Sequence, residues 1–267
     1  MLKLGVNTVL FKKYDVATAL KAIKLAGYDG AELSCIQGMC EHLVLDAWQS
    51  HAPLVRAAAR EAGVELLSME VASLDEARLT KAFEAAAWLG IPVVNVGPSG
   101  KANVPEDLEA CINTLRQRAE LAGRHGVTLC VKAHVGASIY STPTTKAAME
   151  AIDLKSFAID MDPSHIHRAG EKPEEALAAV VSRMGHVHIR DCKGPGPSPG
   201  APEMQACGRG DINLRGYFEE LVKAGYEGPV CLEVIGPELD LQRAQAIASE
   251  SYGYMNAVLK SLGARDK

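Results

Sequence analysis

The sequence has no paired cysteine motif, no long hydrophobic run and no excess of positive charge. Its seven cysteines are odd in number and none has CxxC spacing, so neither a disulfide framework nor a zinc knuckle is indicated. No apolar stretch approaches the roughly 20 residues that cross a bilayer. The opening, MLKLGVNTVLFKKYDVATAL, lacks the pattern of a secretory signal. These features together predict a cytoplasmic protein.

The overall charge offers no footprint for nucleic acid or for an anionic membrane. Lysine and arginine number 28 against 33 acidic residues, which gives a formal net charge of −5. Partners that carry many phosphates require the opposite sign. With 48% hydrophobic and 23% charged residues, the composition is that of an average globular protein. We therefore expect a small-molecule ligand and neither nucleic acid nor a membrane.

Short apolar segments alternate with helical patterns along the whole chain. Each segment is a continuous apolar run bounded by Gly, Pro or Asp, which is typical of buried parallel strands. The predicted strands are residues 2–6, 30–33, 64–71, 92–96, 127–131, 157–161, 186–189 and 229–234. The predicted helices are residues 16–26, 47–62, 74–89, 105–124, 144–152, 173–181, 214–224 and 239–262. Eight such units predict a single (β/α)8 TIM barrel domain over residues 1–267.

Two features qualify this expectation. A doubly wound open sheet is the alternative fold, but no GxGxxG turn follows the first strand. Residues 192–210, CKGPGPSPGAPEMQACGRG, are too rich in proline and glycine to form a helix. We expect this segment to be an active-site loop, and a surface insertion is the alternative.

Polar residues gather where the predicted strands end, and the active site of such a barrel lies at that end. These residues are Asn7, Glu32, Glu70, Asn95, Lys132, His134, Asp162, His165, His186, His188, Asp191 and Glu233. Asp162, His188 and Glu233 follow three successive apolar strands. A carboxylate in such a place is costly unless it is paired or metal-bound. Two carboxylates and an imidazole are a suitable set for a divalent ion.

Four segments carry a resemblance to a known family. The opening LGVNTV with AGYDGAEL, then AIDMDPSH, GHVHIRD and GRGDINLRGYFEELVKAGYEGPVCLE, occur in the order found in sugar isomerase/epimerase barrels. This chain resembles the xylose isomerase-like TIM barrels, which include ketose 3-epimerases, hydroxypyruvate isomerases and keto-inositol dehydratases. The resemblance covers nearly the whole chain.

The resemblance implies a divalent metal held by Glu, Asp, His and Glu from four successive strands. The last three match Asp162, His188 and Glu233. Mn²⁺ is the first expectation, with Mg²⁺, Co²⁺ or Zn²⁺ as alternatives. The ion polarises the oxygens of an open-chain sugar, and glutamates such as Glu233 move the proton through an enediolate.

The resemblance also places substrate contacts. His165 resembles a catalytic or substrate-binding histidine, Glu32 a glutamate near the reacting end, and Arg209 a group that holds a substrate oxygen. We expect His188 rather than His186 to face the barrel interior. Association into homo-oligomers is a further implication of the resemblance.

The fifth strand departs from the family pattern, because Lys132 stands where the first metal glutamate is expected. An ammonium does not bind a metal and repels one. Our first expectation is a retained but modified metal site, with His134 or Glu70 filling the place of the glutamate. Lys132 is then the catalytic base, with a pKa lowered by burial and by the nearby dication. A further option is that it forms a Schiff base with a carbonyl substrate. The alternatives are that its ammonium replaces the metal charge, or that it only pairs with Glu70 or Asp162.

Three functions are compatible with these residues, and a fourth is set aside. The leading one is a metal-dependent isomerase or epimerase of a small sugar, in carbohydrate metabolism. The second is a lyase, a dehydratase of a keto-sugar or keto-inositol, at the same site. The third is a non-catalytic sugar-binding barrel. A DNA-repair endonuclease is set aside, because the exits SMEVAS and NVGPSG lack the histidines of a metal cluster.

Overall fold

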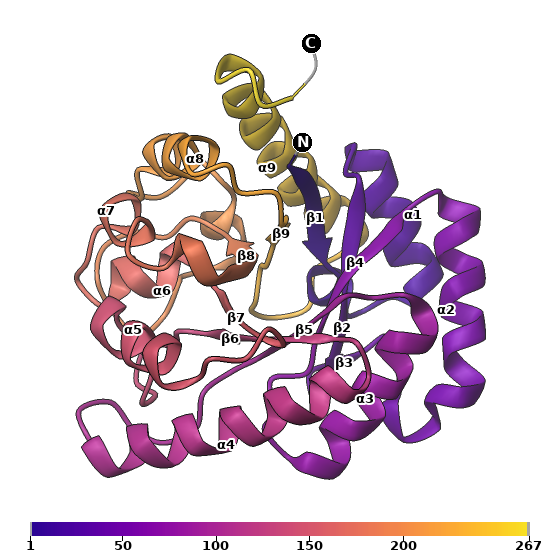
Figure 1. Cartoon of the computed structure of the whole chain (residues 1–267). Helices are drawn as coiled ribbons and strands as arrows, with labels where there is room; N and C mark the ends of the chain where they lie inside the picture. Colours follow the sequence, from indigo (N-terminus) through magenta and orange to yellow (C-terminus); the bar gives the residue numbers. More distant parts are fainter. Residues whose placement is uncertain (1, 266–267) are drawn as a thin grey trace.

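Parallel strands pair side by side into a closed ring in the computed structural model, which describes residues 2–265 (Figure 1). The ring closes because β1 pairs in parallel with both β2 and β9. Its strands are β1 (Lys3–Asn7), β2 (Gly30–Ile36), β4 (Glu65–Glu70), β5 (Val93–Val96), β6 (Thr128–Lys132), β7 (Phe157–Asp160), β8 (Met184–Ile189) and β9 (Pro229–Leu232). A short strand, β3 (Cys40–Glu41), pairs antiparallel with β2.

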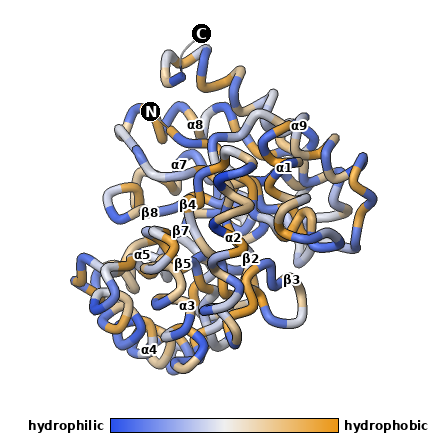
Figure 2. Tube along the Cα trace, turned by 90° about the vertical axis from the view of Figure 1, so that its right-hand side faces the viewer, coloured by the Kyte–Doolittle hydropathy of each residue, from blue (hydrophilic) through white to orange (hydrophobic). Residues whose placement is uncertain are grey.

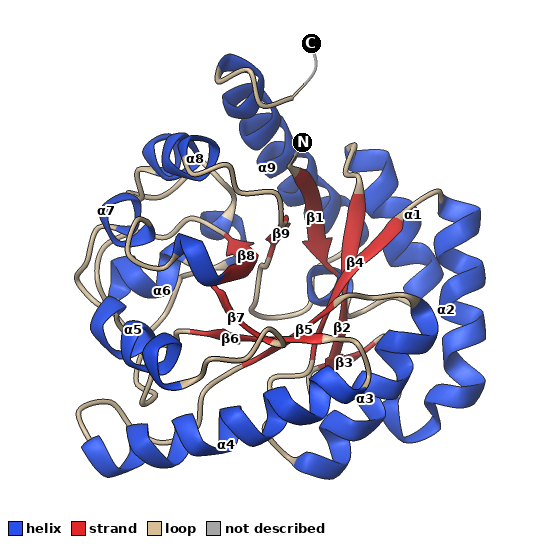
Figure 3. Ribbon diagram, viewed as in Figure 1, coloured by secondary structure: helices blue, strands red, loops and turns tan. Residues whose placement is uncertain are grey.

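Helices surround this ring on its outer side (Figure 3). They are α1 (Val16–Ala26), α2 (Trp48–Ala62), α3 (Glu76–Leu89), α4 (Pro105–Arg124), α5 (Thr142–Ala151), α6 (Pro163–Arg168), α7 (Pro173–Leu177), α8 (Leu214–Lys223) and α9 (Leu241–Ser261). Hydrophobic and hydrophilic residues mix along these helices (Figure 2), as expected for helices with one face on a barrel. No helix within the described part of the chain is both long and apolar enough to span a membrane.

The predicted (β/α)8 barrel is confirmed, and the strands lie close to the predicted residues. Among the strands and α-helices of residues 2–265, β3 and α6 were not predicted. The two-residue β3 is too short to carry a pattern, and α6 lies between the predicted strand 157–161 and the predicted helix 173–181. α6 begins where the Asp162 side chain accepts a hydrogen bond from the Ser164 amide, with Pro163 at its first position. Aspartate at the cap and proline directly after it are favourable helix starts.

Side chains fill the barrel differently at its two ends. Toward the N-terminal end, Gly5 and Gly30 leave room for the side chain of Leu67. Toward the C-terminal end, the interior is polar and almost wholly buried. Leu2 and Arg265 meet at the opposite side from this polar end, where Arg265 donates to the Leu2 carbonyl at 3.2 Å. The active site of such a barrel lies at the C-terminal end of its strands, which is the polar end of this one.

The proline- and glycine-rich segment 192–210 follows β8 and is held at its base by Asp191. The Asp191 carboxylate accepts hydrogen bonds from the backbone amides of Cys192 at 2.9 Å, Gly208 at 3.0 Å and Ile212 at 3.2 Å. The Gln205 amide donates to the Ile235 carbonyl at 2.7 Å, just beyond β9. The segment is thus tied to the exits of β8 and β9.

The close packing at the N-terminal end predicts that Gly30→Ala destabilises the barrel. An added Cβ would lie 2.5 Å from Leu67 Cγ and 2.7 Å from the Glu65 carbonyl oxygen. We expect the free energy of unfolding to fall by about 1–3 kcal/mol, as for overpacked cores, measured by urea denaturation. Gly253→Ala in α9 is the control, because an added Cβ there meets nothing within 4 Å. Equal stabilities for the two variants would contradict this account.

Candidate functional site

A lysine and two glutamates from three strands meet at the C-terminal end of the barrel. The Lys132 ammonium, at the end of β6, donates to Glu233 Oε1 at 2.8 Å and to Glu70 Oε1 at 3.2 Å. Glu70 ends β4, and Glu233 follows β9 directly. The three residues are at most 5% exposed. The sequence-predicted residues Lys132, Glu70 and Glu233 are therefore brought together in one buried cluster.

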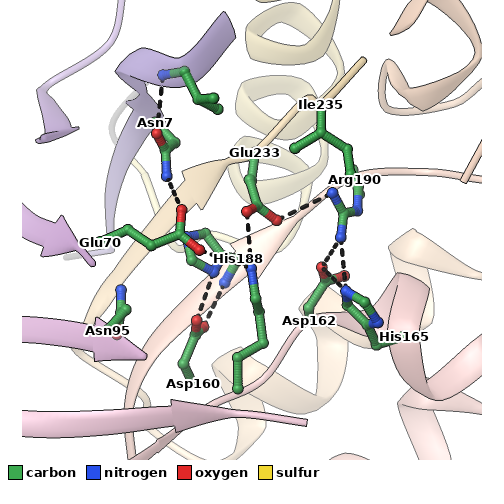
Figure 4. Close-up of polar contacts among 12 residues, drawn as sticks. Asn7, Glu70, Asn95, Asp160, Asp162, His165, His188, Arg190, Glu233 and Ile235 are labelled. Carbon is green, nitrogen blue, oxygen red and sulfur yellow. Dashed lines mark hydrogen bonds and ion pairs between the residues drawn. The ribbon is translucent and has the colours of Figure 1, made fainter. Parts of the chain in front are cut away.

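An arginine that was not predicted extends this cluster. The Arg190 guanidinium lies between two carboxylates, 3.1 Å from Glu233 Oε2 and 2.8 Å from Asp162 Oδ2. It also donates to Ser164 Oγ at 2.8 Å and to His165 Nε2 at 2.9 Å. Figure 4 shows this chain of contacts from Glu233 through Arg190 to Asp162 and His165. Arg190 is 1% exposed, so its charge is balanced by these carboxylates.

A second polar layer lies deeper in the barrel and is organised by Asp160. His186 Nδ1 lies 3.1 Å from Asp160 Oδ1, and His188 Nδ1 lies 2.5 Å from Oδ2. His188 Nε2 contacts Glu32 Oε2 on the other side. Glu32 Oε1 accepts from Asn95 Nδ2 at 2.5 Å. His188 is therefore clamped between two carboxylates, one at each ring nitrogen.

The expectation that only His188 faces the interior is wrong. Residues two apart on a strand lie on the same face, and both His186 and His188 contact Asp160. The same spacing continues to Arg190, and it also relates Asp160 to Asp162. The strings HVHIR and DMD therefore carried the signal for Arg190 and Asp160, which strand alternation would have found.

The charges of Lys132, Glu70 and Glu233, which together are called the mouth cluster, set the pKa values of these three groups. Burial disfavours the charged form of Lys132, but the charges of Glu233 and Glu70 outweigh burial and raise the lysine pKa. Burial acts to raise the pKa of Glu233, but Lys132 and Arg190 hold that pKa well below its usual range. The positive charge near Glu70 does not outweigh its burial, so burial and then the charge of Glu233 raise its pKa to about 7. Glu70 is the one group of the three poised to exchange a proton near neutral pH.

These values correct one expectation for Lys132. Burial and a nearby dication were expected to lower its pKa and leave a neutral amine that acts as base. Two carboxylates in contact with it have the opposite effect, and its pKa is raised. Lys132 is an ammonium in this arrangement.

The inner layer is also charged. Burial acts to lower the pKa of His188, yet the charges of Asp160 and Glu32 raise it well above the usual value. Burial acts to raise the pKa of Asp160, yet His188 and His186 hold it well below its usual range. The inner layer is thus a fixed set of ion pairs that supports the mouth cluster from below.

A divalent ion has a candidate donor group here, and its donors are already engaged. Glu70, His188 and Glu233 each offer one ligand atom, and these atoms lie within 4.8 Å of one another. Lys132, however, contacts both glutamates, and both ring nitrogens of His188 face carboxylates. Asp162, the remaining predicted ligand, is bound by Arg190. The structure therefore does not bring Asp162 together with His188 and Glu233. Glu70, His188 and Glu233 are the residues that would hold an ion, and Lys132 contacts both of these glutamates.

The other predicted residues lie in three places. His134 is exposed on the loop after β6, and its ring packs on His165 with centroids 4.2 Å apart. Glu32 lies in the inner layer, where both of its oxygens accept hydrogen bonds. Arg209 lies apart from the cluster, paired with Glu250 of α9 at 2.6 Å and largely exposed. The structure therefore brings His134 and His165 together and does not bring Arg209 to them.

Removal of the Lys132 charge should produce a defect in stability that depends on pH. In Lys132→Met, Glu70 would have no cation in contact and Glu233 would keep only Arg190, and a broken buried pair costs about 3–5 kcal/mol. One of the two carboxyls then takes up a proton that the unfolded chain does not hold. Stability therefore rises as pH falls, so the defect should shrink from about pH 8 to about pH 5. Urea denaturation across this range measures it.

A matched control is Lys81→Met, which removes an exposed pair with Asp46. Such a pair contributes about 0–1 kcal/mol, so its loss should be small at every pH. A Lys132→Met defect that is equally small, or that grows as pH falls, would contradict the assigned charges.

Among known proteins with similar sequences, some are named dehydratases and others isomerases. An inosose dehydratase of Geobacillus thermodenitrificans is 28% identical over 135 residues, which cover 46% of this chain and 45% of that protein. An inosose isomerase of Halalkalibacterium halodurans is 25% identical over 162 residues, with coverages of 58% and 57%. The chain thus matches about half the length of these curated relatives.

Comparison of whole structures supports the fold. A crystal structure of a D-tagatose 3-epimerase-like protein superposes with a TM-score of 0.77 and 20% identity, covering 98% of this chain and 100% of that one. The sequence model of the xylose isomerase-like TIM barrel matches residues 20–257. The chain belongs to the xylose isomerase-like TIM barrel family.

Proposed function

We propose that this protein is an enzyme that removes a proton from the carbon next to a carbonyl group in a small hydroxylated sugar derivative. The observation that carries the proposal is the buried cluster of Lys132, Glu70 and Glu233 at the barrel mouth. Such a cluster combines a proton acceptor with fixed positive charge, and the formation of an enediolate requires both.

Glu70 is the proton acceptor in this proposal. Its pKa of about 7 makes it a stronger base than Glu233, whose pKa is held well below its usual range. A pKa near the working pH is favourable for a group that must both take and return a proton. The substrate C–H proton passes to a Glu70 carboxylate oxygen, and the electron pair moves onto the carbonyl oxygen.

Lys132 and Arg190 supply the charge that stabilises this oxygen. Both are cations held in place by carboxylates, so they need not reorganise as negative charge develops. A divalent ion would supply Lewis-acid polarisation at the same step. We infer that the Lys132 ammonium takes that role, because it contacts two of the three donor groups that would hold the ion.

Isomerisation or epimerisation is the first outcome, in line with the family. In isomerisation, the proton on Glu70 returns to the neighbouring carbon on the same face of the enediolate, while the hydroxyl proton of that carbon moves to the former carbonyl oxygen. Epimerisation requires in addition that an acid on the opposite face supplies the returning proton, while Glu70 keeps the one it removed. The mass of the compound is unchanged. Glu233 and His165 contribute by holding the cations and the substrate hydroxyls.

Dehydration is the second outcome, and the names of the curated relatives favour it. The enolate expels the hydroxyl group on the next carbon, and a carbon–carbon double bond forms. The proton that Glu70 received leaves with that hydroxyl as water. One acid–base group therefore suffices for the whole elimination, which agrees with a single group of near-neutral pKa in the cluster.

The proposal predicts solvent exchange at carbon that depends on Glu70. In D₂O, a screen of keto-sugars, keto-inositols and sugar acids should find a substrate that gains deuterium next to its carbonyl. Glu70→Gln should lower the exchange rate by about 10²–10⁴-fold, the usual contribution of a general base. For the natural protein, kcat/KM should rise as pH increases through about 7, because Glu70 must be ionised. NMR and mass spectrometry report deuterium and loss of water.

Two further variants serve as a positive and a negative control for this experiment. Glu233→Gln should also abolish turnover, since it removes the anchor of both cations, while circular dichroism shows a folded chain. Glu250→Gln alters a surface pair with Arg209 and should leave exchange unchanged. Full exchange by Glu70→Gln would overturn the assignment of the base. Absence of exchange with every compound would count against the function itself.

Metal content distinguishes the ammonium from a divalent ion. We expect the purified protein to hold substoichiometric Mn, Mg, Co or Zn by elemental mass spectrometry, and its exchange activity to survive a chelator. Lys132→Glu should gain about one divalent ion per chain, because it removes the ammonium and adds a carboxylate ligand. About one Mn²⁺ per natural chain, lost together with activity on chelation, would instead support the metal-dependent reading.

A further inference from the structure

We propose that Arg168, His165 and His134 form a subsite for a negatively charged group, so that the substrate is a sugar acid or a sugar phosphate. This inference rests on the proposed function, because it names the substrate class of the same site. The shared chemistry is an oxyanion, either a carboxylate or a phosphate.

Arg168 is a buried cation whose charge is not matched by a contacting carboxylate. It ends α6, is 7% exposed, and donates to the Ser164 carbonyl at 3.2 Å and to the Pro197 carbonyl at 2.8 Å. No carboxylate of residues 2–265 lies within 4.0 Å of its guanidinium. Lys132 and Arg190, in contrast, are each paired with carboxylates. A buried guanidinium in this state is costly unless an anion joins it.

His165 lies where hydrogen-bond donors converge. Its Nδ1 faces the Val135 amide at 3.1 Å and Arg168 Nη2 at 2.9 Å, while its Nε2 faces Arg190 Nη2 at 2.9 Å. An imidazole offers at most one ring lone pair in any protonation state, so it cannot accept hydrogen bonds from the donors at both of its nitrogens. An oxyanion beside it would accept the hydrogen bonds that the imidazole cannot.

His134 connects this group of donors to solvent. Its ring packs on that of His165, and its side chain is exposed, so a ligand can approach from the loop after β6. Arg190 links His165 to Glu233, which places the donors beside the reacting cluster. An anionic group bound here leaves the rest of a small sugar chain directed toward Glu70 and Lys132.

The loop after β8 belongs to the same subsite. Arg168 Nη1 bonds the Pro197 carbonyl within segment 192–210. A bound oxyanion would therefore hold Arg168 while Arg168 holds the loop. This explains why the most proline-rich segment of the chain is fastened at its middle by a buried cation.

Binding of plain anions tests the subsite without any substrate. Inorganic phosphate and, separately, malonate are titrated into the natural protein at constant ionic strength set with sodium chloride, with calorimetry and thermal unfolding as readouts. We expect one of the two to bind and to raise Tm. Arg168→Gln should weaken that binding about tenfold or more, the loss expected for hydrogen bonds to a charged group. Arg168→Lys should retain part of the affinity.

Kinetics then separates a substrate role from a structural one. Deuterium exchange is compared for a neutral ketose, the matching keto acid and the matching phosphate ester. The charged compound should have the higher kcat/KM, and Arg168→Gln should remove this advantage through KM with little change in kcat. Arg215→Gln, which alters an exposed pair with Glu219, should leave all three rates unchanged.

The possible outcomes are distinct. Faster exchange of the neutral ketose, or an equal loss for all three compounds in Arg168→Gln, would overturn the anion subsite and leave the proposed function in place. Anion binding that depends on Arg168, together with no exchange of any compound, would support the subsite and count against the proposed reaction. Preference for the keto acid or for the phosphate identifies which oxyanion the site accepts.

Discussion

The ion pairs that Lys132 makes with Glu70 and Glu233 are the constraint on which the C-terminal end of this barrel depends. Three charged groups are buried there to at most 5% exposure, and each is tolerable only because of the others. The ammonium keeps Glu233 ionised and Arg190 in place, and Arg190 in turn fixes Asp162. The incomplete compensation of Glu70 leaves its pKa near 7. Structure and acid–base chemistry thus follow from the same contacts.

The layer beneath makes the arrangement rigid. Asp160 and Glu32 hold His188 from its two sides, and Asn7 and Asn95 bond Glu32. These groups come from strands all around the ring, so none of them can shift without breaking a buried hydrogen bond. A preorganised site requires such support, because charges that stabilise a developing oxyanion act best when they do not move.

The sequence predicted the fold well and the site in part, for identifiable reasons. Continuous apolar runs and glycine-terminated helices are local signals, and they located the strands of the barrel. Lys132, Asp162 and Glu233 were found because they follow those strands. Arg190 and Asp160 were missed, although they share a face with residues that were found. The pairing of Lys132 with Glu70 and Glu233 joins positions 62 and 101 residues apart, and the direction of the lysine pKa depends on that pairing.

A divalent ion and a pair of fixed cations meet the same electrostatic requirement in different ways. An ion gathers carboxylates and leaves coordination positions for substrate oxygens. An ammonium and a guanidinium also gather carboxylates, but they act through directed hydrogen bonds and carry one charge each. Lys132 and Arg190 together carry the charge of one divalent ion, spread along the line from Glu70 to Asp162. Because that line continues through His165 to Arg168, a guanidinium without a contacting carboxylate lies beyond the reacting cluster. A substrate that brings its own negative charge pairs with this guanidinium, whereas a neutral sugar leaves it without an anion.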